Sequence, residues 1–347
     1  MIVLEGGRNK QEVELPDLIK EMGTIIDDVN EYALQRGELG GLDWGIECFN
    51  EAFEGLNPGL HLVAGQANVG KSALCMQLAW SIANANKTKT EKKPHKAYVL
   101  YFSLDDNVKE ILPRLIALDQ KIPINVVTKP KKYQNDPSAM PYLVRREEGI
   151  RRLRNAIPYI KVVDSNYVPM ADTIEVICKT IGDHNFALKE MDEDYKLVVF
   201  IDNFHDISSS ETNFNNDENA KFTHISGELG SMCTQYDIPI ICTAEFKKLN
   251  GARRPIIDDV KSTGKIAYEA KAIMLCYNEV GLRGESAQVF WEQDGINEKR
   301  PLLEVKVGKN KLSSYKKRMF FEFVPEMSYL REVPPEGTRR YNQMING

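Results

Sequence analysis

The chain lacks the features of membrane and secreted proteins. It contains no apolar run of about eighteen residues, the length that a membrane-spanning helix needs. Its first residues, MIVLEGGRNKQEVELPD, lack the charged start and the apolar core of a signal peptide. We therefore expect a cytoplasmic protein with no membrane span and no membrane partner.

The chain also has no excess of positive charge and no metal-binding cysteine pattern. Its formal net charge is −5, so any nucleic-acid contact must come from local basic loops rather than from an overall basic surface. The six cysteines are scattered, mostly inside apolar runs, without a C-x-x-C pair or a histidine at ligand spacing. We expect buried free thiols rather than zinc or disulfides. They are Cys48, Cys75, Cys178, Cys233, Cys242 and Cys276.

A glycine-rich stretch within residues 60–85 has the pattern of a phosphate-binding loop. The motif G-x-x-x-x-G-K-[ST] begins at Gly65 and ends at Ser72, between a short apolar run and a long apolar helix pattern. Glycines let successive N–H groups point at phosphate oxygens, and the helix N-terminus adds a positive dipole end. Lys71 would reach the β- and γ-phosphates of ATP, and Ser72 would bind Mg²⁺. The residues expected around the phosphates are Gly65, Gln66, Ala67, Asn68, Val69, Gly70, Lys71, Ser72 and Ala73.

Strand and helix patterns alternate through most of the chain. Apolar runs such as AYVLYFSL (97–104) and LVVFID (197–202) have the composition of buried parallel strands, and helix patterns separate them. This alternation predicts an α/β fold with a mostly parallel sheet that has helices on both faces. Near the end of the chain, PLLEVKV and MFFEFV predict a β-hairpin with a basic turn.

Four segments are expected along the chain. Residues 1–14 form a flexible lead, and apolar positions at helical spacing predict an amphipathic helix within residues 15–40. Residues 41–333 form the phosphate-loop domain, and residues 334–347 form a loosely ordered tail. Because the first helix stands apart from the nucleotide core in sequence, it could dock on the chain's own body or on a neighbour.

Two acidic residues follow strands of the expected sheet. Asp202 ends the run LVVFID, where a carboxylate would face the bound phosphates and hold Mg²⁺, unless it only caps a turn. Asp105 ends the strand YVLYFSL and is the candidate that polarises the attacking water. Asp105 and Asp106 could equally cap the next helix, and the sequence leaves both interpretations open.

Six segments occur in a specific order along the chain: GLDWGIECFNEAFEGLNPGLHLVAGQANVGKSALCMQLA, VLYFSLD, LVVFIDNFHDI, IPIICTAEFKK, RRPIIDDVKSTGKI and VKVGKNK. Their order and approximate spacing resemble the C-terminal motor domain of DnaB-like replicative helicases, which are RecA-like ring ATPases. The resemblance covers residues 15–325 and implies a RecA-like fold in a homo-oligomeric, hexameric ring. It also implies that the N-terminal helix is a linker helix that packs on the adjacent subunit.

The resemblance assigns a role to each residue of the nucleotide site. Lys71 and Ser72 would lie on phosphate and Mg²⁺, and Asp202 would be the acid on the magnesium side. Asp105 takes the place of a catalytic glutamate, and its side chain is one methylene shorter, so the attacking water would have to lie closer. Glu245 matches a glutamine that senses the γ-phosphate, although a carboxylate near phosphates is repelled unless it is protonated or metal-bound.

Basic residues near the end of the chain and in one loop also match family features. The Lys-x-Arg finger, which enters the neighbour's site, corresponds to Lys309 and Lys311; a second lysine keeps the charge but loses the bidentate fork of arginine. The alternative for both is a solvated hairpin tip. A basic loop would contact the backbone of single-stranded DNA inside the ring, or else it is a solvated surface. Its residues are Lys247, Lys248, Arg253 and Arg254.

The sequence therefore predicts an ATP-hydrolysing motor that uses Mg²⁺ and moves along or unwinds single-stranded nucleic acid. The chain contains no counterpart of the family's collar domain, so we expect a separate collar, loader or primase protein as a partner. The alternative is an ATP-controlled assembly or regulatory subunit of a phage or mobile element, acting in the host cytoplasm. The changes at Asp105, Glu245 and Lys311 favour this slower switch.

Overall fold

The computed structural model describes residues 2–4, 11–13, 15–35, 39–90, 93–192, 194–210, 214, 217–249, 253–261 and 264–346. Within these residues, one nine-stranded sheet has the order β13-β12-β11-β8-β3-β7-β6-β4-β5. The six strands from β8 to β5 are parallel, and β11, β12 and β13 extend the sheet as antiparallel strands. The mostly parallel sheet and the C-terminal hairpin of β11 and β12 confirm the predicted fold class.

The bounds of the strands and helices are as follows. The strands are β1 (Ile2–Leu4), β2 (Gln11–Val13), β3 (Gly59–Gly65), β4 (Lys96–Ser103), β5 (Ile160–Val163), β6 (Tyr195–Asp202), β7 (Pro239–Glu245), β8 (Ala272–Asn278), β9 (Trp291–Glu292), β10 (Lys299–Arg300), β11 (Leu302–Asn310), β12 (Arg318–Val324) and β13 (Tyr329–Glu332). The helices are α1 (Leu15–Gln35), α2 (Glu47–Phe53), α3 (Lys71–Ala85), α4 (Val108–Gln120), α5 (Ile124–Thr128), α6 (Pro130–Tyr133), α7 (Met140–Ala156), α8 (Ile174–Met191), α9 (Glu218–Tyr236), α10 (Gly264–Glu269), α11 (Glu279–Arg283) and α12 (Pro335–Asn346).

Helices cover both faces of the sheet because its strands are apolar on both sides. Successive residues of a strand point to opposite faces, so Val63 and Phe200 join one core whereas Leu62 and Ile201 join the other. The first core includes apolar residues of α2, α3 and α4, and the second includes those of α8, α9 and α10. A sheet buried on both faces presents its functional groups at the strand ends, where the connecting loops lie.

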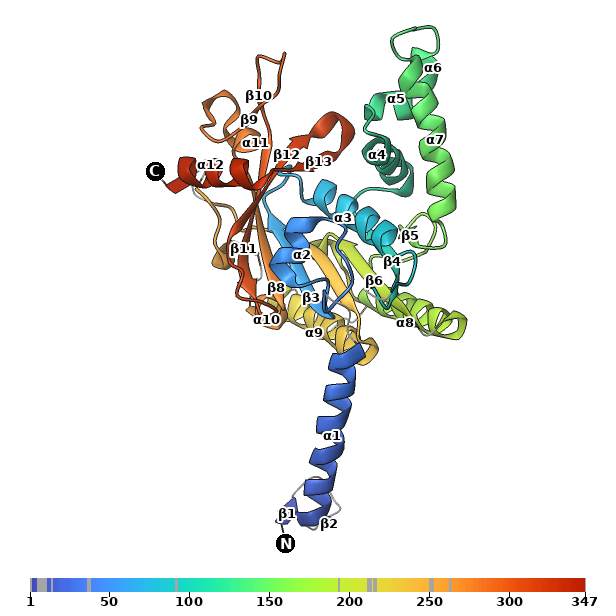
Figure 1. Ribbon diagram of the computed structural model, residues 1–347, viewed down its shortest axis with the longest axis vertical. Coiled ribbons are helices and arrows are strands. Elements are labelled where there is room, and N and C mark those ends of the chain that lie inside the picture. The colour runs from blue at the N-terminus through green and yellow to red at the C-terminus, as the bar shows by residue number, and fades with distance from the viewer. Residues whose placement is uncertain are drawn as a thin grey trace.

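Helix α1 projects from the body of the molecule as a long single arm (Figure 1). This helix confirms the helical pattern expected within residues 15–40. Large apolar side chains along it are exposed, including Ile26 at 61% and Val29 at 63%. No helix among the described residues is long and apolar enough to cross a membrane.

The described residues near both ends of the chain include regular secondary structure. In the lead, β1 pairs with β2 in an antiparallel register, with Ile2 opposite Val13. The expectation of a loosely ordered tail from Pro334 is wrong, because α12 follows β13. Tyr341 of α12 is buried, and its ring lies 5.5 Å from that of Phe320. An aromatic contact with β12 therefore holds a helix whose own sequence is mostly polar.

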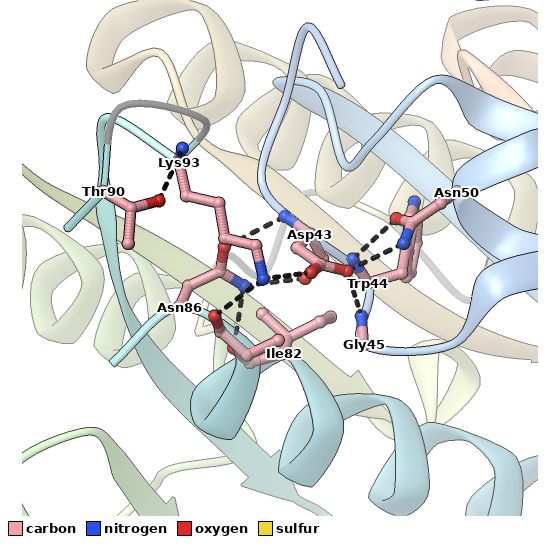
Figure 2. Close-up of polar contacts among 9 residues, drawn as sticks. Asp43, Trp44, Gly45, Asn50, Ile82, Asn86, Thr90 and Lys93 are labelled. Carbon is pink, nitrogen blue, oxygen red and sulfur yellow. Dashed lines mark hydrogen bonds and ion pairs between the residues drawn. The ribbon is translucent and has the colours of Figure 1, made fainter. Parts of the chain in front are cut away.

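A buried amide ties the chain that follows α1 to the end of α3 (Figure 2). Asn86 donates from Nδ2 to the carbonyl oxygens of Asp43 (2.7 Å) and Ile82 (2.9 Å), and its Oδ1 accepts from the Asp43 N–H (3.0 Å). The Asp43 carboxylate in turn pairs with Lys93 at 2.5 Å and accepts from Asn50 at 2.8 Å. Since α3 begins at Lys71, this network connects the phosphate-loop helix to the segment that leads back to α1.

Candidate nucleotide site

Four parallel strands end at the same edge of the sheet and bring the predicted site residues together. Gly65, the last residue of β3, is the register partner of Glu245 at the end of β7. Asp202, the last residue of β6, is the register partner of Ser103 at the end of β4. The carboxyl edge of a parallel sheet is the usual ligand-binding edge in α/β proteins. The phosphate loop and the acid at 202 therefore lie on the same side of the molecule.

The loop between β3 and α3 depends on glycine at two positions. A Cβ atom on Gly65 would lie 2.8 Å from Val69 Cγ2 and 3.1 Å from Cys276 Cβ, so a larger residue would displace the loop. Gly70 has a φ of 111°, a conformation that L-residues with side chains rarely adopt. It directly precedes Lys71, the first residue of α3. The loop thus brings its backbone N–H groups to a helix N-terminus, which is the arrangement that binds phosphate.

Lys71 folds back over this loop. Its Nζ atom donates hydrogen bonds to the carbonyl oxygens of Gly65 at 2.9 Å and Gln66 at 2.8 Å. Burial lowers the pKa of Lys71, and the nearby carboxylates of Glu245 and Asp202 oppose this shift. The ammonium group is therefore buried inside the loop and hydrogen-bonded to neutral carbonyl oxygens, from which it can turn to an anionic phosphate.

Asp202 is buried and firmly oriented. Its Oδ1 accepts from Thr243 Oγ1 at 2.5 Å, and its Oδ2 accepts from the Tyr101 hydroxyl at 3.0 Å. Carboxylate and hydroxyl oxygens are suitable Mg²⁺ ligands, and Mg²⁺ in nucleotide sites usually uses one or two of them together with phosphates and waters. Asp202 and Ser72 fit that donor set. No cluster of three or more His, Cys, Asp or Glu residues that could hold a metal alone occurs in the described part of the chain.

The structure distinguishes Asp105 from its neighbours. Asp106 forms an ion pair with Arg114 at 2.6 Å. Asn107, not an aspartate, is the N-cap of α4, and its backbone N–H donates to Glu110 at 3.1 Å. Helix capping therefore does not account for Asp105, which is exposed at the edge where the site lies. Its role as the base stays a prediction.

Sequence reasoning missed two residues of this edge, Asp206 and His205. Both lie in the short 3₁₀ helix η1 (Phe204–Asp206) that follows β6. Burial raises the pKa of Asp206, and the carboxylates of Asp105, Glu245 and Asp202 raise it further. The one signal in the sequence was Asp206, the second acid in LVVFIDNFHDI. Nothing in that segment predicts that the chain after Asp202 turns back toward the other strand ends.

The two lysines assigned to the finger lie away from the phosphate loop of their own chain. Lys309 on β11 pairs with Ile273 on β8, which in turn pairs with Leu62 on β3. Gly65 lies three residues beyond Leu62 on β3, which is roughly 10 Å along the strand direction. In addition, β8 lies between β11, which carries Lys309, and β3. Lys309 donates to the carbonyl oxygens of Ala267 (2.6 Å) and Tyr268 (2.8 Å), and Lys311 reaches the latter at 3.4 Å.

The four basic residues proposed for nucleic-acid contact divide into two kinds. Lys247 and Lys248 are exposed. Arg253 instead forms two hydrogen bonds with Asp259, at 2.7 and 2.5 Å. Arg254 donates to Glu304 at 2.8 Å. Arg253 is exposed as well, but both arginines are paired with carboxylates of their own chain, whereas Lys247 and Lys248 are exposed without such an ion pair among the described residues.

This sheet, loop and buried acid define a RecA-like nucleoside triphosphatase domain with a P-loop. The family model for the DnaB-like helicase C terminal domain matches residues 41–330. The chain therefore belongs to the family of DnaB-like helicase C-terminal domains.

Several relatives and solved structures share this similarity. The chain is 24% identical to Replicative DNA helicase DnaB of Mycoplasma pneumoniae over 92% of its own length and 63% of the relative. It is 21% identical to the protein of the same name from Rickettsia prowazekii over 77% of its length and 55% of that relative. The chain thus spans about three fifths of the length of these proteins.

Two solved structures share the fold. The "ATPase Domain of G40P" superimposes with a TM-score of 0.69 and 16% identity, over 93% of this chain and 100% of that one. "The Structure Of A DnaB-Like Replicative Helicase And Its Interactions With Primase" gives a TM-score of 0.69 and 16% identity, over 94% of this chain and 69% of the other. These similarities support the RecA-like architecture of the sheet and its helices.

Proposed function

We propose that the chain is a Mg-ATP-hydrolysing motor that assembles into a hexameric ring and moves along single-stranded DNA in the cytoplasm. One observation carries the proposal. The phosphate loop and Asp202 lie at one edge of the sheet, whereas the basic pair Lys309 and Lys311 lies where its own nucleotide is out of reach. A site divided in this way is complete only when a second copy supplies the missing cations.

Hydrolysis would use the chain's own residues for binding and a neighbour's residues for charge. Lys71 and the loop amides would hold the phosphates, and Ser72 and Asp202 would hold Mg²⁺. Bound Mg²⁺ would help to neutralise the charge that develops on the phosphates. Asp105, exposed at the same edge, would orient the attacking water. The neighbour's Lys311 would stabilise the transition state as a point charge.

Assembly of the ring is supported by α1. The helix projects away from the body of the molecule, and several of its large apolar side chains are exposed (Figure 1). An amphipathic helix in water gains stability by burying its apolar face. We propose that this face packs on the adjacent subunit, and that a separate collar, loader or primase protein joins the ring. The exposed apolar residues of this face are Met22, Ile25, Ile26, Val29 and Leu34.

The contact with DNA would use the exposed Lys247 and Lys248, repeated around the ring. One basic loop from each subunit is enough to follow a phosphate backbone, and such binding weakens steeply as salt rises. The net charge of −5 limits this attraction to the loop itself.

A second candidate function is an ATP-controlled assembly subunit that hydrolyses ATP slowly and does not unwind DNA. The short side chain of Asp105 favours it, and so does the carboxylate of Glu245 beside Gly65. Lys311 in place of an arginine favours it as well. A single experiment separates the two functions: the ATPase rate with and without single-stranded DNA, at several salt concentrations, with the particle size measured in parallel. A motor gives a rate that DNA raises and salt suppresses; a slow rate that ignores DNA supports the switch.

A further inference from the structure

His205 occupies a packed position directly after the magnesium-side acid. It lies in η1, three residues beyond Asp202, and its backbone N–H donates to Asn203 Oδ1 at 3.0 Å. Its ring meets the rings of Phe204 and Phe222 edge to face, at centroid distances of 5.4 and 5.2 Å. Two aromatic contacts and a backbone bond fix the orientation of the imidazole.

Both ring nitrogens of His205 have backbone partners. The Glu245 N–H donates to Nδ1 at 3.2 Å, and Nε2 lies 3.2 Å from the carbonyl oxygen of Lys261. Since the first partner is a donor and the second an acceptor, the ring must carry its proton on Nε2. Burial lowers the pKa of His205, in agreement with this neutral form. The ring is therefore a neutral bridge with one accepting and one donating side.

The two partners of the ring form the base of the basic loop. Lys261 donates its N–H to the carbonyl oxygen of Glu245 at 2.8 Å, and Phe246 forms an antiparallel bridge with Val260. One step further out, the Lys247 N–H donates to the carbonyl oxygen of Asp259 at 2.7 Å. The exposed Lys247 thus lies in a short stretch of antiparallel backbone pairing, and His205 hydrogen-bonds to Glu245 and Lys261 at the base of this stretch.

The same ring also contacts helix α9, which follows the segment after β6. Phe222 belongs to the second turn of α9, the helix that follows residues 208–217. His205 therefore contacts α9, at the end of the segment that follows β6, through Phe222. It also contacts both ends of the loop that follows β7, through Glu245 and Lys261.

We propose that His205 is a positioning residue that couples the nucleotide edge to the basic loop, so that nucleotide state and nucleic-acid contact affect each other. The inference rests on the proposed function. A shift of Asp202 or Glu245 on ATP binding or hydrolysis moves the imidazole, and the imidazole moves the carbonyl of Lys261 at the base of the loop. Coupling of this kind is reciprocal, so DNA on the loop alters the geometry of the nucleotide edge in return.

Three variants test the two hydrogen bonds separately. His205→Ala removes both bonds. His205→Gln places an amide N–H near the position of Nε2, and it keeps the donor toward Lys261. His205→Asn places a carbonyl oxygen near the position of Nδ1, and it keeps the acceptor toward Glu245. The control is His184→Ala on α8, where a ring of similar exposure hydrogen-bonds to the carbonyl oxygen of Thr180 at 2.8 Å.

The first measurement is the ATPase rate of the full chain with and without single-stranded DNA, with kcat and KM determined separately. We expect the ratio of the DNA-stimulated rate to the basal rate to fall by about fivefold or more in His205→Ala. The KM for ATP should stay unchanged. His205→Gln and His205→Asn retain part of the stimulation, and His184→Ala retains all of it. A proportional fall of basal and stimulated rates in His205→Ala overturns the proposal, since a merely structural role predicts that result.

The second measurement does not depend on DNA. Hydrogen exchange of residues 246–261 is followed with and without a non-hydrolysable ATP analogue and Mg²⁺. We expect the wild-type loop to respond to nucleotide and the His205→Ala loop not to respond. If the wild type shows no DNA stimulation, the motor function fails, and the exchange result alone decides on His205. A wild-type loop that ignores nucleotide, or a His205→Ala loop that still responds, overturns the coupling.

Discussion

Lys71 hydrogen-bonds to Gly65, the glycine that opens its own loop, with 2.9 Å between Nζ and the carbonyl oxygen. A second bond to the carbonyl oxygen of Gln66, at 2.8 Å, completes the contact. The ammonium group is buried beside neutral acceptors, and a buried cation gains more from an anionic partner than from a carbonyl. Phosphate is therefore expected to draw Lys71 away from these oxygens.

The first prediction follows from this contact. Lys71→Ala should lower ATP turnover by about 10²-fold or more, because the only cation of the loop is lost, and should also abolish ATP-dependent assembly. The measurements are steady-state ATP hydrolysis and particle size with and without ATP. Lys96→Ala, which removes a lysine from the start of β4 at the edge of the sheet opposite the nucleotide site, is the control and should hydrolyse ATP normally. Unaltered turnover in Lys71→Ala would refute the site.

The second prediction concerns the lysines at the far end of β11. If Lys311 acts on a neighbour's nucleotide, Lys311→Ala and Lys71→Ala subunits complement each other when mixed. In a random equal mixture about a quarter of the sites combine an intact loop with an intact finger, and turnover should recover to about that fraction. The measurement is ATP hydrolysis of the mixture against each variant alone. Absence of recovery in intact rings would show that Lys311 has no role in trans.

Much of the nucleotide edge is predictable because local patterns determine it. The G-x-x-x-x-G-K-S motif lies between a strand and a helix, and the acid of LVVFID ends a strand, so parallel pairing alone brings Gly65 and Asp202 to one edge. His205 and Asp206 were missed because their positions depend on a 3₁₀ turn after β6, which has no periodic signal. The helix α12 was missed because it depends on a tertiary contact, that of Tyr341 with Phe320.

The basic loop shows the same limit. The sequence lists Arg253 and Arg254 beside Lys247 and Lys248 as equal candidates, since charge is all that a one-dimensional pattern reveals. The ion pairs of Arg253 with Asp259 and of Arg254 with Glu304 join residues from different strands or turns. Only the folded chain shows which cations are already neutralised.

The third prediction tests the amide that joins α3 to the segment after α1. Asn86→Ala should lower the free energy of unfolding by about 3 kcal/mol, because it removes all three hydrogen bonds of a buried amide, including both that hold the backbone of Asp43. Asn84→Ala, two residues earlier on α3, removes one half-buried bond to the carbonyl of Trp80 and should cost much less. Urea denaturation of both variants is the measurement. Equal losses of stability in the two variants would contradict a stabilising role of the Asn86 hydrogen bonds drawn in Figure 2.

The fourth prediction concerns a buried histidine and the pH dependence of stability. His61 on β3 is fully buried, and its Nε2 lies 2.9 Å from the carbonyl oxygen of Asn57. Burial lowers the pKa of His61 from 6.5 to about 4; the charge of Lys271 contributes in the same direction, and the hydrogen bond to Asn57 opposes the shift. Because the unfolded chain binds this proton more readily than the folded chain, stability is complete above about pH 6.5 and falls as the pH decreases toward 4.

Between pH 7 and pH 5 this one group should lower the free energy of unfolding by roughly 2 kcal/mol, at 1.36 kcal/mol for each unit of pKa. His61→Gln keeps a donor near Asn57 but cannot be protonated, so its unfolding curve should lose that part of the pH dependence. His184→Gln, at a half-buried position on α8, should keep the pH dependence of the wild type. Urea titrations at the two pH values give the comparison. Parallel losses in wild type and His61→Gln would show that carboxylates, not this imidazole, set the acid stability, because only the buried ring distinguishes the two proteins.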